Sequence, residues 1–216
     1  MSRVHDVTDG DHQPASGRFG RESLERLMTF GDAVVAIAIT LIVLPLVDTA
    51  MDVDSAAGFF SGHWDTLLAA ALSFVVVAVT WHAHRKLFIG ASGYNATIFW
   101  LEVVWLAAEV FLPVATVLDV LGDGVGRAAL GTYIGDLLLI VSTMRFQGVV
   151  LERTGLVPRS RGPWWARWHV VVTWCVILVL ALTFPGVGGY WMLLALVDAL
   201  VVRMIGLSSA RRGSDG

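Results

Sequence analysis

Cysteine and charge are both scarce in this sequence of 216 residues. A single cysteine, Cys175, allows no internal disulfide and no zinc site built from several cysteines. Charged residues make up 15% of the chain and hydrophobic residues 56%, whereas about a quarter of a soluble domain is charged. The net charge of −3 gives no support for a nucleic-acid partner. These shortages exclude an ordinary soluble domain and indicate a membrane protein.

Common catalytic motifs are also missing. The sequence contains neither the His-Glu-x-x-His pattern of zinc proteases nor the Gly-x-Ser-x-Gly turn of serine hydrolases. We therefore expect no enzymatic activity.

What the chain does contain is a series of long apolar runs. They lie near residues 27–47, 66–88, 97–118, 128–150, 168–185 and 188–206. A helix needs roughly 20 apolar residues to cross a membrane, so the sequence predicts an all-α membrane protein with six transmembrane helices. We divide it into a polar, disordered N-terminal tail (1–25), a six-helix membrane domain (26–206) and a short C-terminal tail (207–216).

Positive charge alternates between the linkers. The second and fourth linkers and both tails are rich in Arg, whereas the first linker carries only Asp and the fifth carries no charge. Because Lys and Arg are retained on the cytoplasmic side of a membrane, this alternation predicts a multi-pass protein of the plasma membrane with both termini in the cytoplasm.

Three motifs in order resemble the transmembrane protein 175 family of potassium channels. Residues 26–33 read Arg-Leu-Met-Thr-Phe-Gly-Asp-Ala, similar to the family signature Arg-x-x-x-Phe-Ser-Asp-(Gly/Ala) with Gly31 in place of Ser. Residues 81–88 resemble the family's Trp-x-x-His-His-x-x-Phe, with Arg85 where a second His is common. Residues 111–116 resemble Phe-Leu-Pro-Phe-x-Thr, and Asn95 precedes them as in the family.

This resemblance implies a homotetramer in which the first helix of each subunit lines a central pore for potassium ions. It implies no cofactor, and no partner beyond potassium ions, membrane lipid and the other subunits. The family lacks the Thr-Val-Gly-Tyr-Gly filter of common potassium channels, and this sequence lacks it too. The constriction residue of the family falls on Ile37 and its nearby threonine on Thr40.

One stripe on the first predicted helix matches that placement. Ile37, Thr40, Leu41 and Leu44 recur at i, i+3, i+4 and i+7, so they share a helix face. From periodicity alone, packing within the membrane is the commoner meaning of such a stripe. The resemblance instead assigns it to a hydrophobic gate, where apolar rings exclude water and Thr40 offers hydroxyls to a cation.

Ionisable and aromatic residues near the start of this helix predict a structural polar network. Arg26 and Asp32 point to different sides of the helix, so each needs a partner on another helix. Trp81 and His84, at the end of the second span, are candidates, and Phe30 belongs to the same motif. We expect Arg26, Asp32 and His84 to form the network, because an unpaired charge at that depth is costly. Snorkelling of these side chains to the interface is the alternative.

Several carboxylates lie inside predicted spans, where charge is expensive and often functional. Glu102 and Glu109 share a face of the third span, and the roles of Asp136 and Asp198 are open. These carboxylates support an alternative function, that of a proton-coupled secondary transporter. In it, protons are relayed by Asp32, Glu102, Glu109 and His84. Internal repeats, common in such transporters, are not evident in this sequence.

Overall fold

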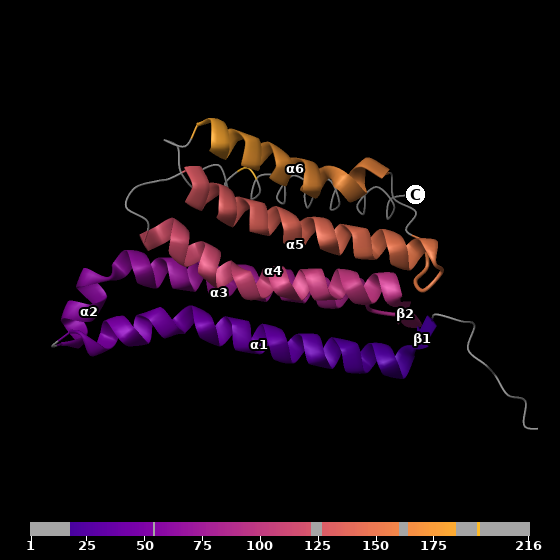
Figure 1. Ribbon diagram of the computed structural model, residues 1–216, viewed down its shortest axis with the longest axis horizontal. Coiled ribbons are helices and arrows are strands. Elements are labelled where there is room, and N and C mark those ends of the chain that lie inside the picture. The colour runs from indigo at the N-terminus through magenta and orange to yellow at the C-terminus, as the bar shows by residue number, and fades with distance from the viewer. Residues whose placement is uncertain (1–17, 54, 122–126, 160–163, 185–193, 195–216) are drawn as a thin grey trace, which may run out of the picture.

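The computed structural model describes residues 18–53, 55–121, 127–159, 164–184 and 194. Its elements in chain order are β1 (Arg18–Gly20), α1 (Arg21–Met51), α2 (Ala56–Gly62), α3 (Trp64–Leu87), β2 (Gly93–Asn95), α4 (Ala96–Leu121), α5 (Arg127–Arg153) and α6 (Trp164–Thr183). The long helices lie side by side, with α1 along one edge of the molecule and α6 along the opposite edge (Figure 1).

Four of the described helices are long and apolar enough to cross a membrane, namely α1, α3, α4 and α5. In α6 the apolar stretch is shorter, Trp168–Thr183. These helices correspond to the first five predicted spans. The sixth, 188–206, lies outside the described residues except for Leu194, so the expected count of six stays a prediction. An all-helical membrane protein is nevertheless the architecture that the described residues form.

Helix α1 begins earlier than the predicted membrane domain, at Arg21 rather than at residue 26. Two charge pairs support its first turns: Arg21 Nε lies 3.2 Å from Glu25 Oε1, and an Arg26 guanidinium nitrogen lies 2.7 Å from Glu22 Oε1. Such i,i+4 pairs stabilise a helix end. At 1.5 Å per residue, α1 is about 46 Å long and exceeds the roughly 30 Å hydrocarbon core of a bilayer. Its charged start therefore extends beyond the apolar part of the helix.

The linker between the first two spans contains a short helix, α2, that the sequence analysis does not predict. Its N-cap is Ser55, whose hydroxyl accepts a hydrogen bond from the backbone N–H of Gly58 at 3.1 Å. None of its residues is buried. The apolar periodicity used to find spans cannot detect a seven-residue exposed helix of this kind.

The strands β1 and β2 join the start of α1 to the start of α4. They pair antiparallel with Phe19 opposite Tyr94, and the two rings stack with centroids 4.8 Å apart. A side chain at Gly93 would overlap the carbonyl oxygen of Phe19, so this close approach requires glycine. Asn95 then caps α4 by accepting a hydrogen bond from the backbone N–H of Ile98 at 2.9 Å. Residues 18–20 therefore belong to the fold, although the sequence analysis places them in the tail.

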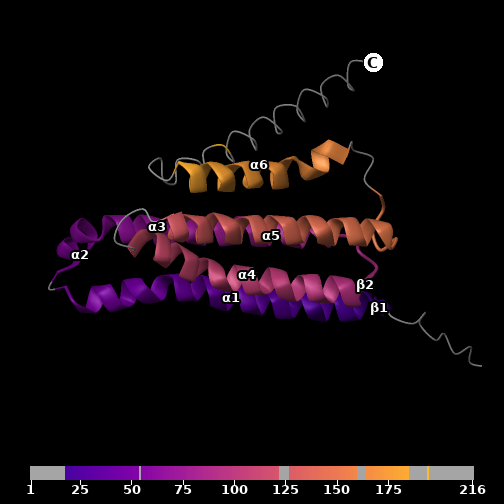
Figure 2. The same ribbon diagram turned by 45° about the horizontal axis from the view of Figure 1, so that its top comes forward.

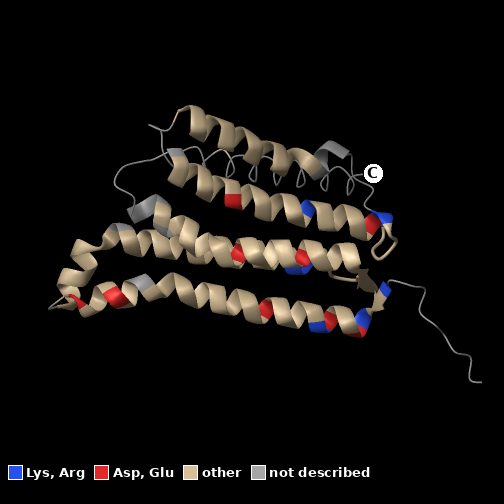
Figure 3. Ribbon diagram, in the orientation of Figure 1, with Lys and Arg blue, Asp and Glu red and all other residues tan. Residues whose placement is uncertain are grey.

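The hydrophobic core lies where α1, α3, α4, α5 and α6 meet. Its largest buried side chains are Trp105, Leu112, Leu130, Ile134, Leu137, Ile140 and Ile177. Many apolar side chains on the opposite helix faces remain exposed, as expected for surfaces in lipid. The described Lys and Arg residues gather toward the end of the bundle that carries β1 and β2 (Figure 3).

Candidate functional site

The predicted stripe lies on the exposed side of α1, and two of its residues, Leu41 and Leu44, also border a cavity next to α3 and α4. Exposure reaches 62% at Ile37 and 54% at Leu44, and Leu41 and Thr40 are also exposed. The opposite face of α1, carrying Val35, Ala38 and Ile42, is buried against the bundle. Since α1 also forms one edge of the molecule (Figure 2), the whole stripe is available to a neighbouring subunit, to a central axis or to lipid.

The hydroxyl of Thr40 has a defined direction within this stripe. Its Oγ1 donates a hydrogen bond to the backbone carbonyl of Ile37 at 2.7 Å. A threonine hydroxyl has one hydrogen and two acceptor lone pairs, so with its hydrogen bound to the backbone it presents only lone pairs outward. Oxygen lone pairs are what a dehydrating cation requires.

Asp32 connects α1 to the end of α3. The indole N–H of Trp81 donates to Asp32 Oδ1 at 2.8 Å, and Arg85 Nη1 lies 3.3 Å from Asp32 Oδ2. Phe30, although part of the same motif, is 61% exposed and lies on the outward face of α1. The carboxylate therefore has both a neutral and a cationic partner on one neighbouring helix.

The predicted grouping of Arg26, Asp32 and His84 is divided in the structure. Arg26 pairs with Glu22 on its own helix, and the two side chains are 80% and 81% exposed. This exposed contact fits the alternative of side chains that snorkel to the interface, rather than a buried network. His84 also lies apart from Asp32 and belongs to a second, buried cluster.

This buried cluster joins α3, α4 and α5. His84 Nε2 lies 2.9 Å from Glu102 Oε2, and the amide of Gln147 donates to the same oxygen at 2.8 Å. The imidazole ring stacks on Trp105 with centroids 3.7 Å apart and planes 8° from parallel. All four side chains are almost fully buried. The sequence groups His84 with Glu102 only in the alternative proton relay, and it gives no prediction for Gln147 or Trp105, although an amide inside an apolar span is a signal that inspection can find.

Gly31 brings α1 close to this buried cluster. A Cβ atom at this position would lie 3.2 Å from Glu102 Oε1 and 3.6 Å from Leu106. Gly31 stands where the resembling signature has Ser, so the smaller residue makes room for the Glu102 carboxylate. The buried cluster and the Asp32 contacts thus both border the same segment of α1.

Two further carboxylates lie deeper in the bundle. Glu109 is fully buried, and among the described residues neither of its carboxylate oxygens has a hydrogen-bond partner. Asp136 on α5 is also buried, and its Oδ2 has no such partner in the described part of the chain. Asp198 lies outside the described residues. Within the described ranges, no group of three His, Cys, Asp or Glu side chains is placed to hold a metal ion.

These features define a polytopic α-helical membrane protein whose first helix presents an exposed apolar face and is linked to α3 by the half-exposed polar contacts of Asp32. The sequence model of the family described as endosomal/lysosomal potassium channel TMEM175 matches residues 26–113, which include the stripe and every residue of the two polar sites except Gln147.

Two bacterial relatives extend this match. A protein of Streptomyces collinus, named a potassium channel, is 28% identical over 148 residues, which cover 64% of this chain and 70% of the relative. A protein of Chamaesiphon minutus, also named a potassium channel, is 30% identical over 120 residues, covering 53% of this chain and 59% of the relative. Over residues 26–113 the chain is similar to the TMEM175 family, a family of ion channels and not of enzymes, and both relatives are named potassium channels.

Proposed function

We propose that this protein is a potassium channel of the plasma membrane that conducts potassium ions passively. Four copies surround a central axis, and each places the outward face of α1 on it. The observation that carries this proposal is the continuous uncovered face of α1, which combines large apolar side chains with one correctly directed hydroxyl at Thr40. The similarity to the TMEM175 family and the names of both relatives support potassium as the permeant ion.

In this proposal the pore narrows at rings of apolar side chains. Four copies of Ile37, and one or two helical turns further on of Leu41 and Leu44, leave little space for water, so the pore closes to ions by dewetting. A cation that passes loses part of its hydration shell, and the lone pairs of the Thr40 ring replace some of it. Selection by these side chains is required because the sequence has no carbonyl filter motif.

The contacts of Asp32 have a structural role in this proposal. Trp81 and Arg85 both bind the carboxylate from α3, so they fix how α1 rotates about its own axis. That rotation decides whether Ile37 or a neighbouring residue faces the pore.

Both termini lie in the cytoplasm under the proposed topology. The Lys and Arg residues near β1 and β2 support this orientation (Figure 3), since positive charge is retained on that side. Helix α2 and the acidic first linker then lie outside the cell.

Replacement of Ile37 by Asn tests the proposed constriction. Asn places a polar ring where the apolar one stands, while the Thr40 hydrogen bond, which uses the backbone of residue 37, is retained. Conductance should rise several-fold and the preference for potassium over sodium should fall, because the ion keeps more of its hydration shell. Purified protein in liposomes with opposed potassium and sodium gradients measures both quantities, and native mass spectrometry measures the tetramer.

The matched control is Ala36→Asn, an exposed position turned by about 100° from Ile37 on the same helix. This variant should change neither conductance nor selectivity. Unchanged behaviour of Ile37→Asn in assembled tetramers would remove the stripe from the pore.

Proton-coupled transport is the second candidate, favoured by the buried Glu109, whose two carboxylate oxygens have no hydrogen-bond partner among the described residues. The same liposomes distinguish it when a proton gradient is imposed without a potassium gradient. A coupled transporter accumulates potassium under this condition. A passive channel accumulates no potassium beyond that driven by the membrane potential, and the Glu109→Gln variant of such a channel should behave in the same way.

A further inference from the structure

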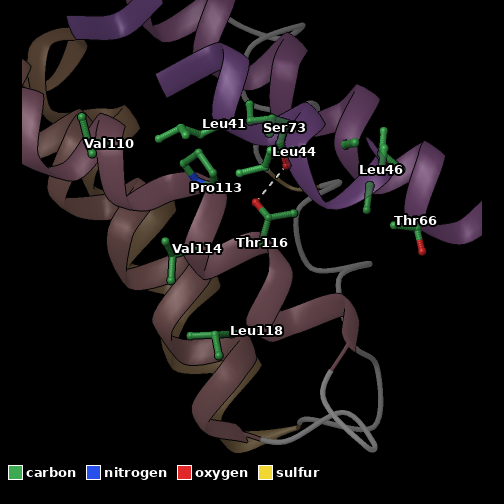
Figure 4. A pocket seen from close by; sticks show the side chains of 13 residues that line it. Leu41, Leu44, Leu46, Thr66, Ser73, Val110, Pro113, Val114, Thr116 and Leu118 are labelled. Atoms are coloured by element: carbon green, nitrogen blue, oxygen red, sulfur yellow. Dashed lines mark hydrogen bonds between the residues drawn. The ribbon is translucent and has the colours of Figure 1, made fainter. Parts of the chain in front are cut away.

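A cavity of about 350 Å³ lies between α1, α3 and α4, in the half of the bundle next to α2. Its walls are almost entirely apolar and include Leu41 and Leu44 of α1 and Val114 of α4 (Figure 4). Three hydroxyls line it, and two of them, those of Ser73 and Thr116, form a hydrogen-bonded pair, whereas Thr66 stands apart from this pair (Figure 4). The size is within the range of roughly 300–1,000 Å³ that small-molecule sites occupy.

The sequence of the surrounding helices accounts for this space. Ala69 and Ala70 supply only methyl groups on the α3 side. On the α4 side, Pro113 has no backbone N–H to bond the carbonyl four residues earlier, and such a proline bends a helix. Figure 2 shows α4 changing direction along its length. The cavity therefore results from small residues facing a bent helix.

The hydrogen bonds of the two hydroxyls can run in only one direction. Thr116 Oγ1 lies 2.9 Å from the backbone carbonyl oxygen of Leu112, and because a carbonyl only accepts, Thr116 must use its hydrogen there. Ser73 Oγ lies 2.8 Å from Thr116 Oγ1, so Ser73 must donate its own hydrogen to Thr116. Both hydrogens are then used, and the pair retains only acceptor lone pairs.

We propose that this cavity binds an uncharged, membrane-soluble alcohol or phenol. The apolar body of the ligand fills the space between the three helices, and its O–H donates to the Ser73–Thr116 pair. Ser73 is 1% exposed, so a hydrogen bond there is shielded from competing water. A ligand with only an acceptor, such as an ether, finds no donor in the pair and buries its oxygen without a partner.

Photolabelling of the purified full-length protein in detergent tests this site. The probe is an alkylphenol that carries a diazirine, and peptide mass spectrometry locates the adducts. Saturable labelling is expected on residues 41–46, 66–73 and 110–118. The competitors are 4-hexylphenol and its methyl ether, 4-hexylanisole, which differ in the O–H. The phenol should displace the probe at about a fivefold lower concentration than the ether, the contribution of one neutral hydrogen bond.

Two sets of variants test the contacts separately. In the double variant Ser73→Ala, Thr116→Val the fivefold ratio should fall to about one, because both acceptors are removed. Ala69→Phe fills the cavity and should abolish labelling, whereas Ala71→Phe, at an exposed position on the same helix, should leave it unchanged. Equal competition by phenol and ether in the wild type would overturn the proposal.

A comparison of labelling in detergent and in phospholipid nanodiscs tests the ligand class. If labelling occurs in detergent but is lost in phospholipid nanodiscs, acyl chains occupy the cavity and the proposed ligand class is wrong. Labelling and competition that persist in nanodiscs support it. None of these measurements depends on ion conduction, so the result stands apart from the proposed channel activity.

Discussion

Replacing Glu102 with Leu should destabilise the protein far more than the same replacement at Glu109. Both carboxylates are fully buried on one face of α4, two turns apart, and the substitution is close in size at each. Their surroundings differ in one respect. Glu102 is in contact with His84 and Gln147, whereas both oxygens of Glu109 have no hydrogen-bond partner among the described residues.

The contacts of each carboxylate determine how much its replacement should change the free energy of unfolding. Without Glu102, the Gln147 amide loses its acceptor and His84 loses the carboxylate that faces it, in a region that water does not reach. Leaving the buried Gln147 donor unsatisfied costs roughly 1–3 kcal/mol, and losing the close contact between His84 and Glu102 adds a comparable amount, which gives about 4 kcal/mol in all. Glu109→Leu removes two unpartnered oxygens and should change the free energy of unfolding by less than about 1 kcal/mol, in either direction.

Thermal unfolding of the detergent-purified variants measures this difference. For a chain of this size about 1 kcal/mol corresponds to roughly 2–4 °C, so Glu102→Leu should lower Tm by about 10 °C. Glu102→Gln should recover much of the loss, because its amide oxygen still accepts from Gln147. Equal loss of Tm in the two leucine variants would show that burial alone, rather than pairing, determines the stability of these sites.

Two predictions concern assembly and orientation. Asp32→Ala should reduce purified yield and tetramer fraction more than it changes ion preference, because it leaves the Trp81 N–H and Arg85 without their acceptor. Normal assembly with altered selectivity would make Asp32 an ion site instead. In a cysteine-free background, a membrane-impermeant thiol reagent applied outside the cell should label a cysteine introduced at Asp54 and not one at Ser160. The opposite labelling would reverse the proposed topology.

The positions of the described spans follow from composition, because any helix in lipid must be apolar over most of its length. Elements outside the membrane do not share this constraint. Helix α2 depends on one capping hydroxyl at Ser55, and the β1–β2 pair depends on the close approach that Gly93 allows. Neither feature extends far enough along the chain to produce a periodic pattern.

Side-chain pairing was harder to predict than helix faces. The stripe of Ile37 and Leu44 follows from the period of one helix, and both residues do share an exposed face. The partner of His84 depends instead on how α3 rotates relative to α1 and α4, which no local pattern records. The sequence therefore groups both Trp81 and His84 with Asp32, whereas the structure places only Trp81 on Asp32 and sets His84 against Glu102.

The polar contacts of α1 lie toward its start, and beyond Asp32 the helix packs on the bundle through apolar side chains such as Val35 and Ile42, so a tilt of the helix would pivot near Asp32. The β1–β2 pair and the contacts of Asp32 hold its first third to the bundle, whereas its last part borders the cavity. With Asp32 as the fulcrum and 1.5 Å per residue, the arm is about 7 Å at Ile37 and about 18 Å at Leu44. In the proposed tetramer, a tilt of α1 about Asp32 would displace Leu44 more than twice as far as Ile37, so the diameter of the Leu44 ring would change more than that of the Ile37 ring.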